Sequence, residues 1–455
     1  TEHAAFRNSI RTAASLYDYQ ADPANAEAMT FESPTSGRRV NRAWQMPESY
    51  EDLVTRRKAL VYWAEQHGGF MGRSPDHLAS AVTGQLMGLD IFEAHDKDRA
   101  KAFWDYYVYA RDNDLFLTYV IINPQVDRSK SASELGNDDP MLKIVDEDST
   151  GVTVRGAKML GTSSIMANEV FVAHLQPLRP DEVDYAICFA MPMATEGLKV
   201  LSRKSYEQHA VSDFDNPLSA RYDENDALMF FDDVKVPWDR IFVHRDPDMC
   251  RRQFHDTPGH IYQNYQAQIR LTVKLKFLVG LAREVCETIG TVKLPPVADA
   301  LGKMAAQAAA VENMMWGMEA KGSQWGKYFV PDRHAVYAAQ TLTQEYYPMI
   351  INTLRELAGG ALIMLPSSTE DLDHPELAAI AESVQVSADG RSAEDRIKMM
   401  KLVWDAVGSE FAGRHTQYEM FYAGAQFVTR GHSFRTYDWE KSAALIRTIT
   451  DRYGR

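Results

Sequence analysis

Two positions in this sequence combine a residue type and a local setting that suit the chemistry of a proton or an oxygen anion. The first is Arg73, which lies in Gly72-Arg73-Ser74-Pro75, where the glycine frees the backbone and the proline fixes the next turn. A buried guanidinium there would stabilise an oxygen anion through charge-assisted hydrogen bonds. The alternative is a surface arginine that pairs locally, because arginines are mostly exposed.

The second position is His260, within 255-HDTPGHIYQNYQ-266 and just before a periodic apolar segment that begins near Leu271. A neutral imidazole at this point can accept a proton or a hydrogen bond near neutral pH. The chain has 13 histidines, and most histidines take no part in catalysis. The residues alone therefore leave both interpretations open.

Two short turns of small polar residues could bind a planar cofactor. They are 123-NPQVDRS-129 and 161-GTSS-164. Their hydroxyl and amide groups, with free backbone N–H groups, can hydrogen-bond the polar edge of such a molecule without adding bulk, although the same residues are common in ordinary β-turns. No Gly-x-Gly-x-x-Gly motif follows a predicted strand and no Walker A loop is present, so a Rossmann-type nucleotide site is not expected.

Two glycine-containing segments interrupt helical patterns in the last third of the chain. Gly408-Ser409-Glu410-Phe411 costs about 1 kcal/mol in helix propensity, so a packing or binding reason is expected. Gly359-Gly360, followed by Pro366-Ser367-Ser368, is either a helix C-cap with a turn or a loop that approaches a bound group.

The composition limits the functions that these residues can serve. A chain of 455 residues suits two or three domains. Its 49 Lys and Arg against 63 Asp and Glu give a net charge of −14, which argues against nucleic-acid binding. No run of 18 apolar residues predicts a membrane span, and the amino-terminal residues predict no secretion signal. Three widely spaced cysteines suit a reducing cytoplasm.

The elements that position these residues fall into three regions. Residues 1–115 are predicted to be a helical domain. Residues 116–245 carry short β-rich runs without intervening helices, which predicts a compact antiparallel barrel or sandwich; the runs are 116–124, 152–160, 169–178, 185–193 and 228–238. Residues 246–455 predict a helical bundle, because apolar residues recur every three or four positions in 270–290 and 396–411. The second of these seams consists of Ile397, Met400, Trp404, Val407 and Phe411.

Four long segments, spread over most of the chain, carry a family resemblance. They are 72-GRSPDH-77, 119-YVIINPQVDRSK-130, 219-SARYDENDALMFFDDVKVPW-238 and 402-LVWDAVGSEFAGRH-415. Together they resemble the two-component FADH2-dependent phenol monooxygenases, which include 4-hydroxyphenylacetate 3-monooxygenase oxygenase components and chlorophenol and nitrophenol monooxygenases. Any one segment alone would be a weak signal, whereas their joint occurrence is a strong one.

The resemblance implies a fold, a cofactor and partners. The fold would be acyl-CoA-dehydrogenase-like, mainly α, with an N-terminal helical domain, a small antiparallel β barrel and a C-terminal four-helix bundle. The cofactor would be FADH2, which diffuses from a separate NAD(P)H:flavin reductase and reacts with O2 to give a C4a-hydroperoxyflavin that hydroxylates a phenol. The resemblance also implies a homotetramer.

The resemblance further implies roles for individual residues. Arg73 and His260, the latter in preference to His255, would be catalytic and would hold the phenol as a phenolate. The substrate would contact Arg73, His77, Tyr119 and Phe411. The flavin would contact Asn123, Gln125, Arg128, Thr162, Ser163, Gly408, Ser409, Glu410 and Phe411, and no metal ion is implied.

Within the family, the sequence is most similar to the chlorophenol and nitrophenol branch. The 4-hydroxyphenylacetate enzymes carry a histidine where this chain has Tyr119. The segment 417-QYEMFYAGAQFVTRGHSFRTYDW-439 also resembles the chlorophenol branch. This predicts para-hydroxylation of halo- or nitrophenols with loss of halide or nitrite. The alternative is ortho-hydroxylation of 4-hydroxyphenylacetate-like phenols to catechols.

Two other classes of function are alternatives. The same fold hosts CoA-ester enzymes, namely acyl-CoA dehydrogenases and 4-hydroxybutyryl-CoA dehydratase. The dehydratase needs cluster-binding cysteines in its first domain, whereas no cysteine precedes Cys188 here, and this excludes it. The sequence does not dismiss an acyl-CoA dehydrogenase. A non-catalytic oligomeric scaffold is disfavoured because Arg73 and His260 are retained.

Overall fold

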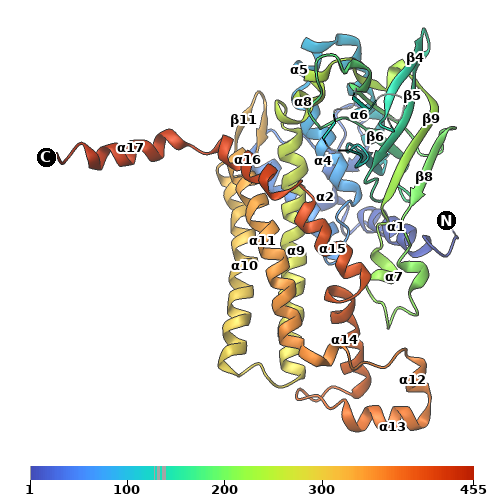
Figure 1. The fold of residues 1–455 in the computed structure, drawn as a ribbon, viewed down its shortest axis with the longest axis vertical. Helices are drawn as coiled ribbons and strands as arrows, with labels where there is room; N and C mark the ends of the chain where they lie inside the picture. The colour runs from blue at the N-terminus through green and yellow to red at the C-terminus, as the bar shows by residue number, and fades with distance from the viewer. Residues whose placement is uncertain (1, 128, 131–133, 136–139, 455) are drawn as a thin grey trace.

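The chain passes through a helical part, a β part and a second helical part, in the predicted order (Figure 1). The computed structural model describes residues 2–127, 129–130, 134–135 and 140–454. In the view of Figure 1 the strands lie on the right and the long bundle helices on the left, with helices α4 and α6 between them. Helix α4 contacts both the bundle and the strands.

The amino-terminal part includes the helix that carries His77. Helix α3 (Tyr50–Gln66) begins with a capping box between Ser49 and Asp52 and ends just before two glycines with left-handed backbone. Helix α4 (Pro75–Leu86) has a proline at its first position, and all of its residues are buried. The remaining elements are α1 (Arg7–Ala21), α2 (Ala26–Met29), β1 (Thr30–Glu32), β2 (Arg39–Asn41), α5 (Leu89–His95) and α6 (Lys97–Asp112).

Two four-stranded sheets make up the β part, in the orders β10-β7-β6-β3 and β4-β5-β9-β8. Neighbouring strands are antiparallel, as predicted, except that β3 pairs with β6 in parallel. The exception arises because the chain leaves the first sheet after β3, forms β4 and β5 in the second, and returns to β6 in the original direction. The strands are β3 (Leu117–Val120), β4 (Lys143–Asp148), β5 (Gly151–Met159), β6 (Glu169–Val172), β7 (Ile187–Pro192), β8 (Leu198–Ser202), β9 (Ala227–Pro237) and β10 (Ile241–His244).

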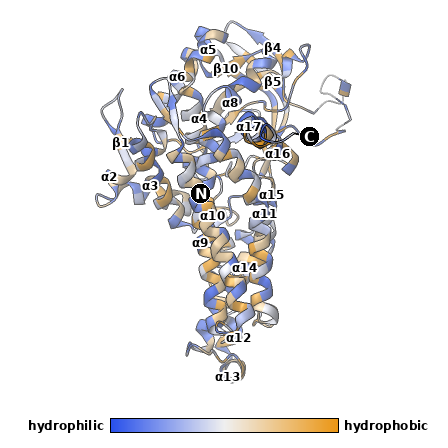
Figure 2. Cartoon of the chain, turned by 90° about the vertical axis from the view of Figure 1, so that its left-hand side faces the viewer, coloured by the Kyte–Doolittle hydropathy of each residue, from blue (hydrophilic) through white to orange (hydrophobic). Residues whose placement is uncertain are grey.

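Long helices form the second helical part, and their apolar faces meet in one core (Figure 2). The predicted seams are buried at every position except two. Ile289 is half-buried, and Trp404, whose indole lies against Gly408, is 37% exposed. The helices are α8 (Pro247–His255), α9 (Gly259–Thr288), α10 (Pro295–Ala320), α11 (Arg333–Ala358), α12 (Glu370–Asp373), α13 (Pro375–Val384), α14 (Ala393–Val407), α15 (Glu410–Phe421), α16 (Gln426–Thr436) and α17 (Trp439–Thr450).

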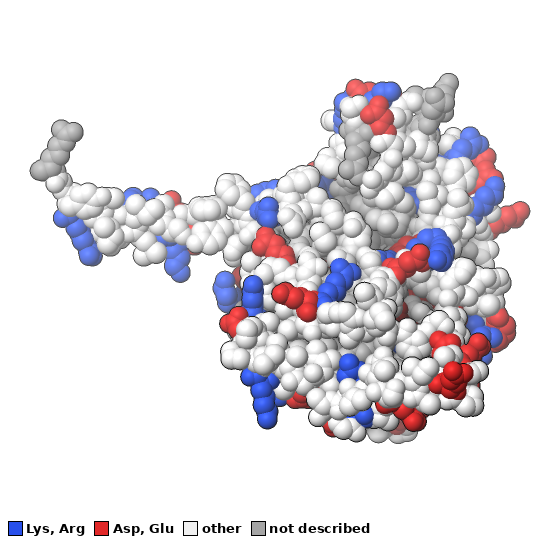
Figure 3. Space-filling model, turned by 60° about the horizontal axis from the view of Figure 1, so that its bottom comes forward, with Lys and Arg blue, Asp and Glu red and all other residues white. Residues whose placement is uncertain are grey.

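The last helix, α17, extends away from the body of the molecule as an arm (Figures 1 and 3). None of its residues is buried. Its apolar positions, such as Leu445 and Ile446, are 68% and 64% exposed. Among the described residues, no helix combines the length and apolar composition that a membrane span needs.

Candidate functional site

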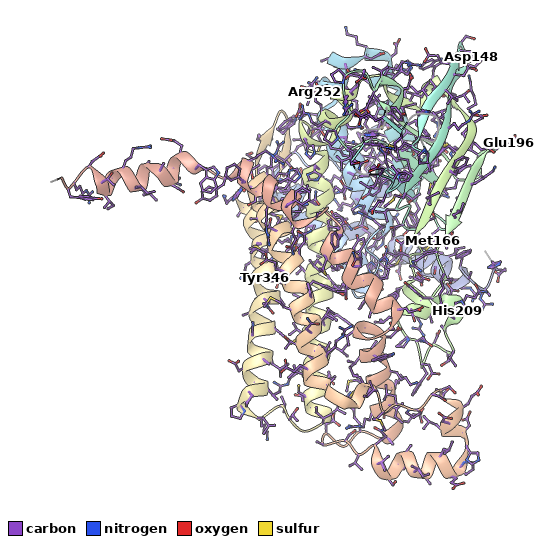
Figure 4. The ribbon with its side chains drawn as sticks, in the orientation of Figure 1. Asp148, Met166, Glu196, His209, Arg252 and Tyr346 are labelled. Carbon is purple, nitrogen blue, oxygen red and sulfur yellow. The ribbon has the colours of Figure 1, made fainter. Side chains whose placement is uncertain are left out.

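Four of the predicted site residues meet at one hollow, where the start of α4 faces β3 and the turn after β5. The hollow is lined by seven residues and leaves no room for a water molecule between them. The turn is easy to find in Figure 4, because it immediately precedes the labelled Met166, at the junction of the β part and the helices. The lining residues are Arg73, His77, Leu117, Thr118, Tyr119, Leu160 and Thr162.

Arg73 lies in a cage of aromatic rings. Its guanidinium carbon is 4.8 Å from the centroid of Tyr119, 4.9 Å from that of Tyr422 and 5.5 Å from that of Tyr418. The preceding Gly72 makes this cage possible, because a Cβ there would lie 2.5 Å from the Tyr418 ring. Burial alone would lower the pKa of Arg73, but the tyrosine hydroxyls outweigh burial and raise it, so the side chain stays charged.

His77 connects the Arg73 side chain to helix α9. Its Nε2 is bonded to Arg73 Nη1, and its Nδ1 lies 2.9 Å from Gln266 Oε1. The Nε2 atom also lies 3.4 Å from Gln263 Nε2, which donates to the Tyr119 hydroxyl at 3.1 Å. Burial, reinforced by the Arg73 charge, lowers the pKa of His77 well below its usual value, so the imidazole is neutral at physiological pH.

A network of buried ion pairs fixes the two turns that supply Arg73 and Thr162. The backbone N–H of Arg73 donates to the carboxylate of Glu224. The Thr162 hydroxyl donates to Asp226 at 2.7 Å. Arg414 of α15 bridges the two carboxylates, at 2.9 Å from Glu224 and 2.7 Å from Asp226. The acidic residues of the 219–238 segment therefore hold the site together.

In and near the turn after Thr162, several hydroxyl groups have no hydrogen-bond partner among the described residues. The hydroxyls of Ser163 and Ser164 are buried and have no partner among the described residues, and the same is true of the Tyr418 hydroxyl. Ser163 has a left-handed backbone, with φ of 65°. Buried polar groups without partners are rare in proteins. This group of hydroxyls fits the polar edge and side chain of a flavin.

The other predicted cofactor loop lies partly outside the described residues. Asn123 is buried, and its Oδ1 accepts from Lys158 at 2.7 Å. Gln125 is exposed. Arg128, predicted as a flavin contact, lies outside the described residues.

The remaining predicted site residues lie in two other places. His260 Nδ1 is 3.0 Å from the Tyr337 hydroxyl, and its ring contacts His255 and His432 rather than Arg73. Phe411 packs against Phe70, Tyr206 and His415 in the helical core.

The segment before Phe411 has a structural role in the chain. Gly408 ends α14, and the Ser409 side chain caps α15 by accepting from the N–H of Ala412 at 3.1 Å. Glu410 is exposed and pairs with Lys204 at 2.6 Å. Helix capping therefore accounts for the interruption of the helical pattern at residues 408–411.

Several residues at the hollow were not predicted from the sequence. Gln263 and Gln266 come from α9, Tyr418 and Tyr422 from the end of α15, and Glu224 from the loop before β9. Gln263, Gln266 and Arg270 follow a spacing of three and four, which places them on one face of the helix, but this pattern becomes a signal only once the helix is known to be buried. The first half of α9 is buried on every side, so such a polar stripe requires a polar neighbour.

Solved structures identify the class of fold. Butyryl-CoA dehydrogenase from Megasphaera elsdenii superposes with a TM-score of 0.51 at 12% identity, covering 98% of this chain and 99% of that one. The predicted acyl-CoA-dehydrogenase-like fold is therefore confirmed. An oxygenase component of 4-hydroxyphenylacetate 3-monooxygenase, solved with FAD and 4-hydroxyphenylacetate, superposes far more closely, with a TM-score of 0.93 at 32% identity over 99% of this chain and 93% of that one.

Sequence comparisons define the family. The N-terminal model of 4-hydroxyphenylacetate 3-hydroxylase matches residues 1–243 and the C-terminal model matches residues 250–451. The chain belongs to this family. It is 34% identical to the 4-hydroxyphenylacetate 3-monooxygenase oxygenase component of Pseudomonas aeruginosa, covering 96% of this chain and 84% of the relative. It is also 34% identical to the 4-nitrophenol 2-monooxygenase oxygenase component of a Rhodococcus species, covering 96% and 83%.

Proposed function

We propose that this protein is the oxygenase component of a two-component flavin monooxygenase, which hydroxylates a phenol at the carbon next to its hydroxyl group. It would use O2 and reduced FAD, delivered by a separate NAD(P)H:flavin reductase. The observation that carries the proposal is the Arg73 guanidinium, held beside His77 and Tyr119 at the wall of a hollow.

These side chains suit the oxygen of a phenol. Arg73, the Gln263 amide and the Tyr119 hydroxyl are hydrogen-bond donors that converge near His77. Donors around the phenol oxygen favour the phenolate, whose ortho and para carbons are more electron-rich. Arg73 supplies the largest contribution because it carries a full charge at a partly buried site.

The hydroxyls beside the hollow would hold reduced FAD. Thr162, Ser163 and Ser164 would hydrogen-bond its polar edge, and the unpaired Tyr418 hydroxyl, which lies against Gly72, is a further donor. When bound, reduced FAD supplies the electrons that activate O2. The hollow has no room for a water molecule in this structure, whereas ligand pockets measure roughly 300–1,000 Å³, so binding requires the side chains at its wall to move apart.

The names of the relatives favour ortho-hydroxylation. Position 3 of 4-hydroxyphenylacetate and position 2 of 4-nitrophenol are both next to the ring carbon that bears the hydroxyl group. Para-hydroxylation with loss of halide or nitrite stays a second candidate. Tyr119 and the 417–439 segment favour it, because both resemble the chlorophenol branch.

A single assay tests the proposal. The purified protein is mixed with enzymatically reduced FAD, O2 and a panel of phenols that contains 4-hydroxyphenylacetate, 4-nitrophenol and chlorophenols. Catechol products are expected, without released halide or nitrite. Release of these ions would identify para attack instead. No product from any phenol, together with tightly bound oxidised FAD and oxidation of an acyl-CoA, would replace the proposal with an acyl-CoA dehydrogenase.

We further propose a homotetramer. Two exposed apolar surfaces support it, the arm α17 and the loop after Gly359, where Ile363 and Met364 are each 73% exposed. Multi-angle light scattering measures the mass in solution. A monomer at all concentrations would contradict this assembly.

A further inference from the structure

We propose that His77 accepts the proton of the phenol, and that Gln266 and Asp76 hold its ring in the one tautomer that can do so. This inference rests on the proposed function. It assigns the base to α4, at the hollow, in place of His260, whose ring contacts a different group of residues.

The orientation of Gln266 follows from Asp76. The Nε2 of Gln266 donates to Asp76 Oδ2 at 3.0 Å, and the other carboxylate oxygen of Asp76 accepts from the Ser74 hydroxyl. Burial raises the pKa of Asp76, whereas the hydrogen bonds from Ser74 and Gln266 and the charge of Arg56 act in the opposite direction and favour the carboxylate, which only accepts hydrogen bonds. The amide nitrogen of Gln266 must therefore face Asp76, and its oxygen must face His77.

The tautomer of His77 follows from Gln266. An amide oxygen 2.9 Å from Nδ1 can only accept, so the hydrogen of the neutral ring is on Nδ1. The opposite nitrogen gives the same answer independently. Nε2 is surrounded by donors, Arg73 Nη1 and Gln263 Nε2, and so must carry a lone pair. In this structure Arg73 donates to that lone pair, so under the proposal the phenol takes the place of this contact before Nε2 accepts the proton.

The surroundings keep this base neutral until a phenol is deprotonated. Burial and the charge of Arg73 favour the neutral ring. The negative charge of a neighbouring phenolate offsets the charge of Arg73 and so favours protonation of Nε2. The charged and titratable groups that face His77 are Arg73 in the turn before α4, Asp76 on α4, Tyr119 on β3, Arg270 on α9, and Tyr422 after α15.

The proton balance is complete with the co-substrates already named. The O–H bond of the phenol breaks, both electrons stay on oxygen, and the proton moves to Nε2 while Nδ1 keeps its hydrogen. The proton later leaves with the second oxygen atom of O2, which departs as water. In total, one phenol, O2 and FADH2 give one catechol, FAD and water.

The main test compares phenols of different acidity in the variant His77→Gln. Glutamine keeps a hydrogen-bonding group but is not a base. With a phenol that is un-ionised at the assay pH, kcat is expected to fall by about 100-fold or more. With a nitrophenol that is already ionised at that pH, the loss is expected to stay below about threefold, because no proton needs to be removed. An equal loss for all phenols, or none, would overturn the proposal.

Two further histidine variants make this test specific. His95→Gln is the matched control, since His95, the last residue of α5, pairs with Asp246 outside the hollow, and normal kinetics are expected. His260→Gln tests the competing base. If His260→Gln, and not His77→Gln, loses activity in proportion to the pKa of the phenol, His260 is the base and the proposal fails.

The positioning role of Gln266 is tested with Gln266→Met, which keeps the volume and removes the amide. A loss of about tenfold in kcat is expected, again confined to weakly acidic phenols. Gln268→Met is the control, because Gln268 is buried on the same helix but faces Thr343 of α11. Similar effects of the two variants would mean that Gln266 acts only through packing.

A measurement without cofactor or turnover separates this inference from the proposed function. Nitrogen-15 NMR of histidine-labelled protein reports which ring nitrogen carries the hydrogen, and the His77 signal is assigned by its loss in His77→Gln. Hydrogen on Nδ1 is expected, and hydrogen on Nε2 would overturn the inference even if the wild type hydroxylates phenols. Conversely, a wild type that hydroxylates no phenol would remove the proposed function whatever the tautomer.

Discussion

Two clusters in this molecule place histidines among aromatic rings, and they differ in what holds them. In the first, His77 has a hydrogen-bond partner on each ring nitrogen and an arginine beside it. In the second, the rings of His255, His260 and His432 pack against one another and against Tyr337, and the only hydrogen bond of the His260 ring among the described residues joins it to that tyrosine. A histidine that is fixed at both nitrogens has one defined tautomer, whereas stacking alone defines none. The first cluster is therefore the better candidate for chemistry.

The largest expected effect separates the two clusters by activity. Replacing Arg73 with methionine removes the charge that favours the phenolate and should lower kcat/KM by about 10²–10³-fold. Arg73→Lys, which keeps the charge without the planar fork, should lose less. In the second cluster, Tyr337→Phe should change kcat/KM by less than about threefold. Steady-state kinetics with supplied FADH2 measure all three, and a large loss in Tyr337→Phe alone would reverse the comparison.

The next effect concerns the buried charges on which the first cluster rests. Glu419 on α15 pairs with Arg270 and with Lys274, at 3.0 Å from the latter, and all three are almost fully buried. Burial alone would raise the pKa of Glu419, but the two cations outweigh it and lower it to about 2. Glu419→Gln leaves both cations unpaired and should destabilise the fold by about 3–5 kcal/mol at pH 7.

The pH dependence of this effect has a defined sign. A carboxylate with a lowered folded-state pKa stabilises the fold above its unfolded pKa of 4.5 and loses that contribution as the pH falls toward 2. The difference in free energy of unfolding between wild type and Glu419→Gln, measured by urea unfolding, should therefore shrink to zero as the pH falls through this range. A gap that stays constant down to pH 2 would show that Glu419 acts through packing.

A smaller effect tests the aromatic cage. In Gly72→Ala the new Cβ would meet the Tyr418 ring at 2.5 Å, which should cost about 1–3 kcal/mol of stability. The same change should also lower phenol affinity, because the ring must leave Arg73. Gly413→Ala is the control on the helix that carries Tyr418, since its Cβ would meet nothing within 4 Å. Thermal unfolding and phenol binding in parallel check both variants, and equal behaviour would contradict the cage.

The smallest effect lies in the second cluster. Burial and the neighbouring charges lower the pKa values of His255 and His432 to about 4. A histidine whose folded-state pKa is lowered costs stability as the pH falls from its unfolded value of 6.5 toward 4. His432→Gln should remove on the order of 1 kcal/mol of this acid sensitivity. Identical pH profiles of unfolding for wild type and variant would contradict the lowered pKa of His432, which arises from burial and from the charge of Arg435.

The sequence predicted the fold well where burial leaves a periodic pattern. Strands β5 and β9 lie in the interior of their sheet and alternate in burial, and both were recognised as β-rich runs. Strands β4 and β8 were not recognised. They form the two edges of that sheet, and most of their residues are exposed, so their sequences carry little apolar alternation.

The site was predictable only in part, for a related reason. Arg73, His77, Tyr119 and Thr162 were named through family resemblance, and they line one hollow. Their partners come from helices distant in sequence, and a glutamine on such a helix is indistinguishable from a surface residue until its burial is known. The Asp76–Gln266 contact, which defines the tautomer of His77, thus required the structure.

The ion pairs and hydrogen bonds at the hollow join parts of the chain that are far apart. The Arg73–Glu224 bond spans 151 residues, and the His77–Gln266 bond spans 189. Contacts of such long range form late in folding, because the intervening loop must close first. A chain still leaving the ribosome thus has its arginine and histidine long before their partners from α9 and α15. During synthesis, phenol binding should therefore appear only when the carboxyl-terminal helices are complete. Binding of a phenol at this hollow would then report that folding is finished.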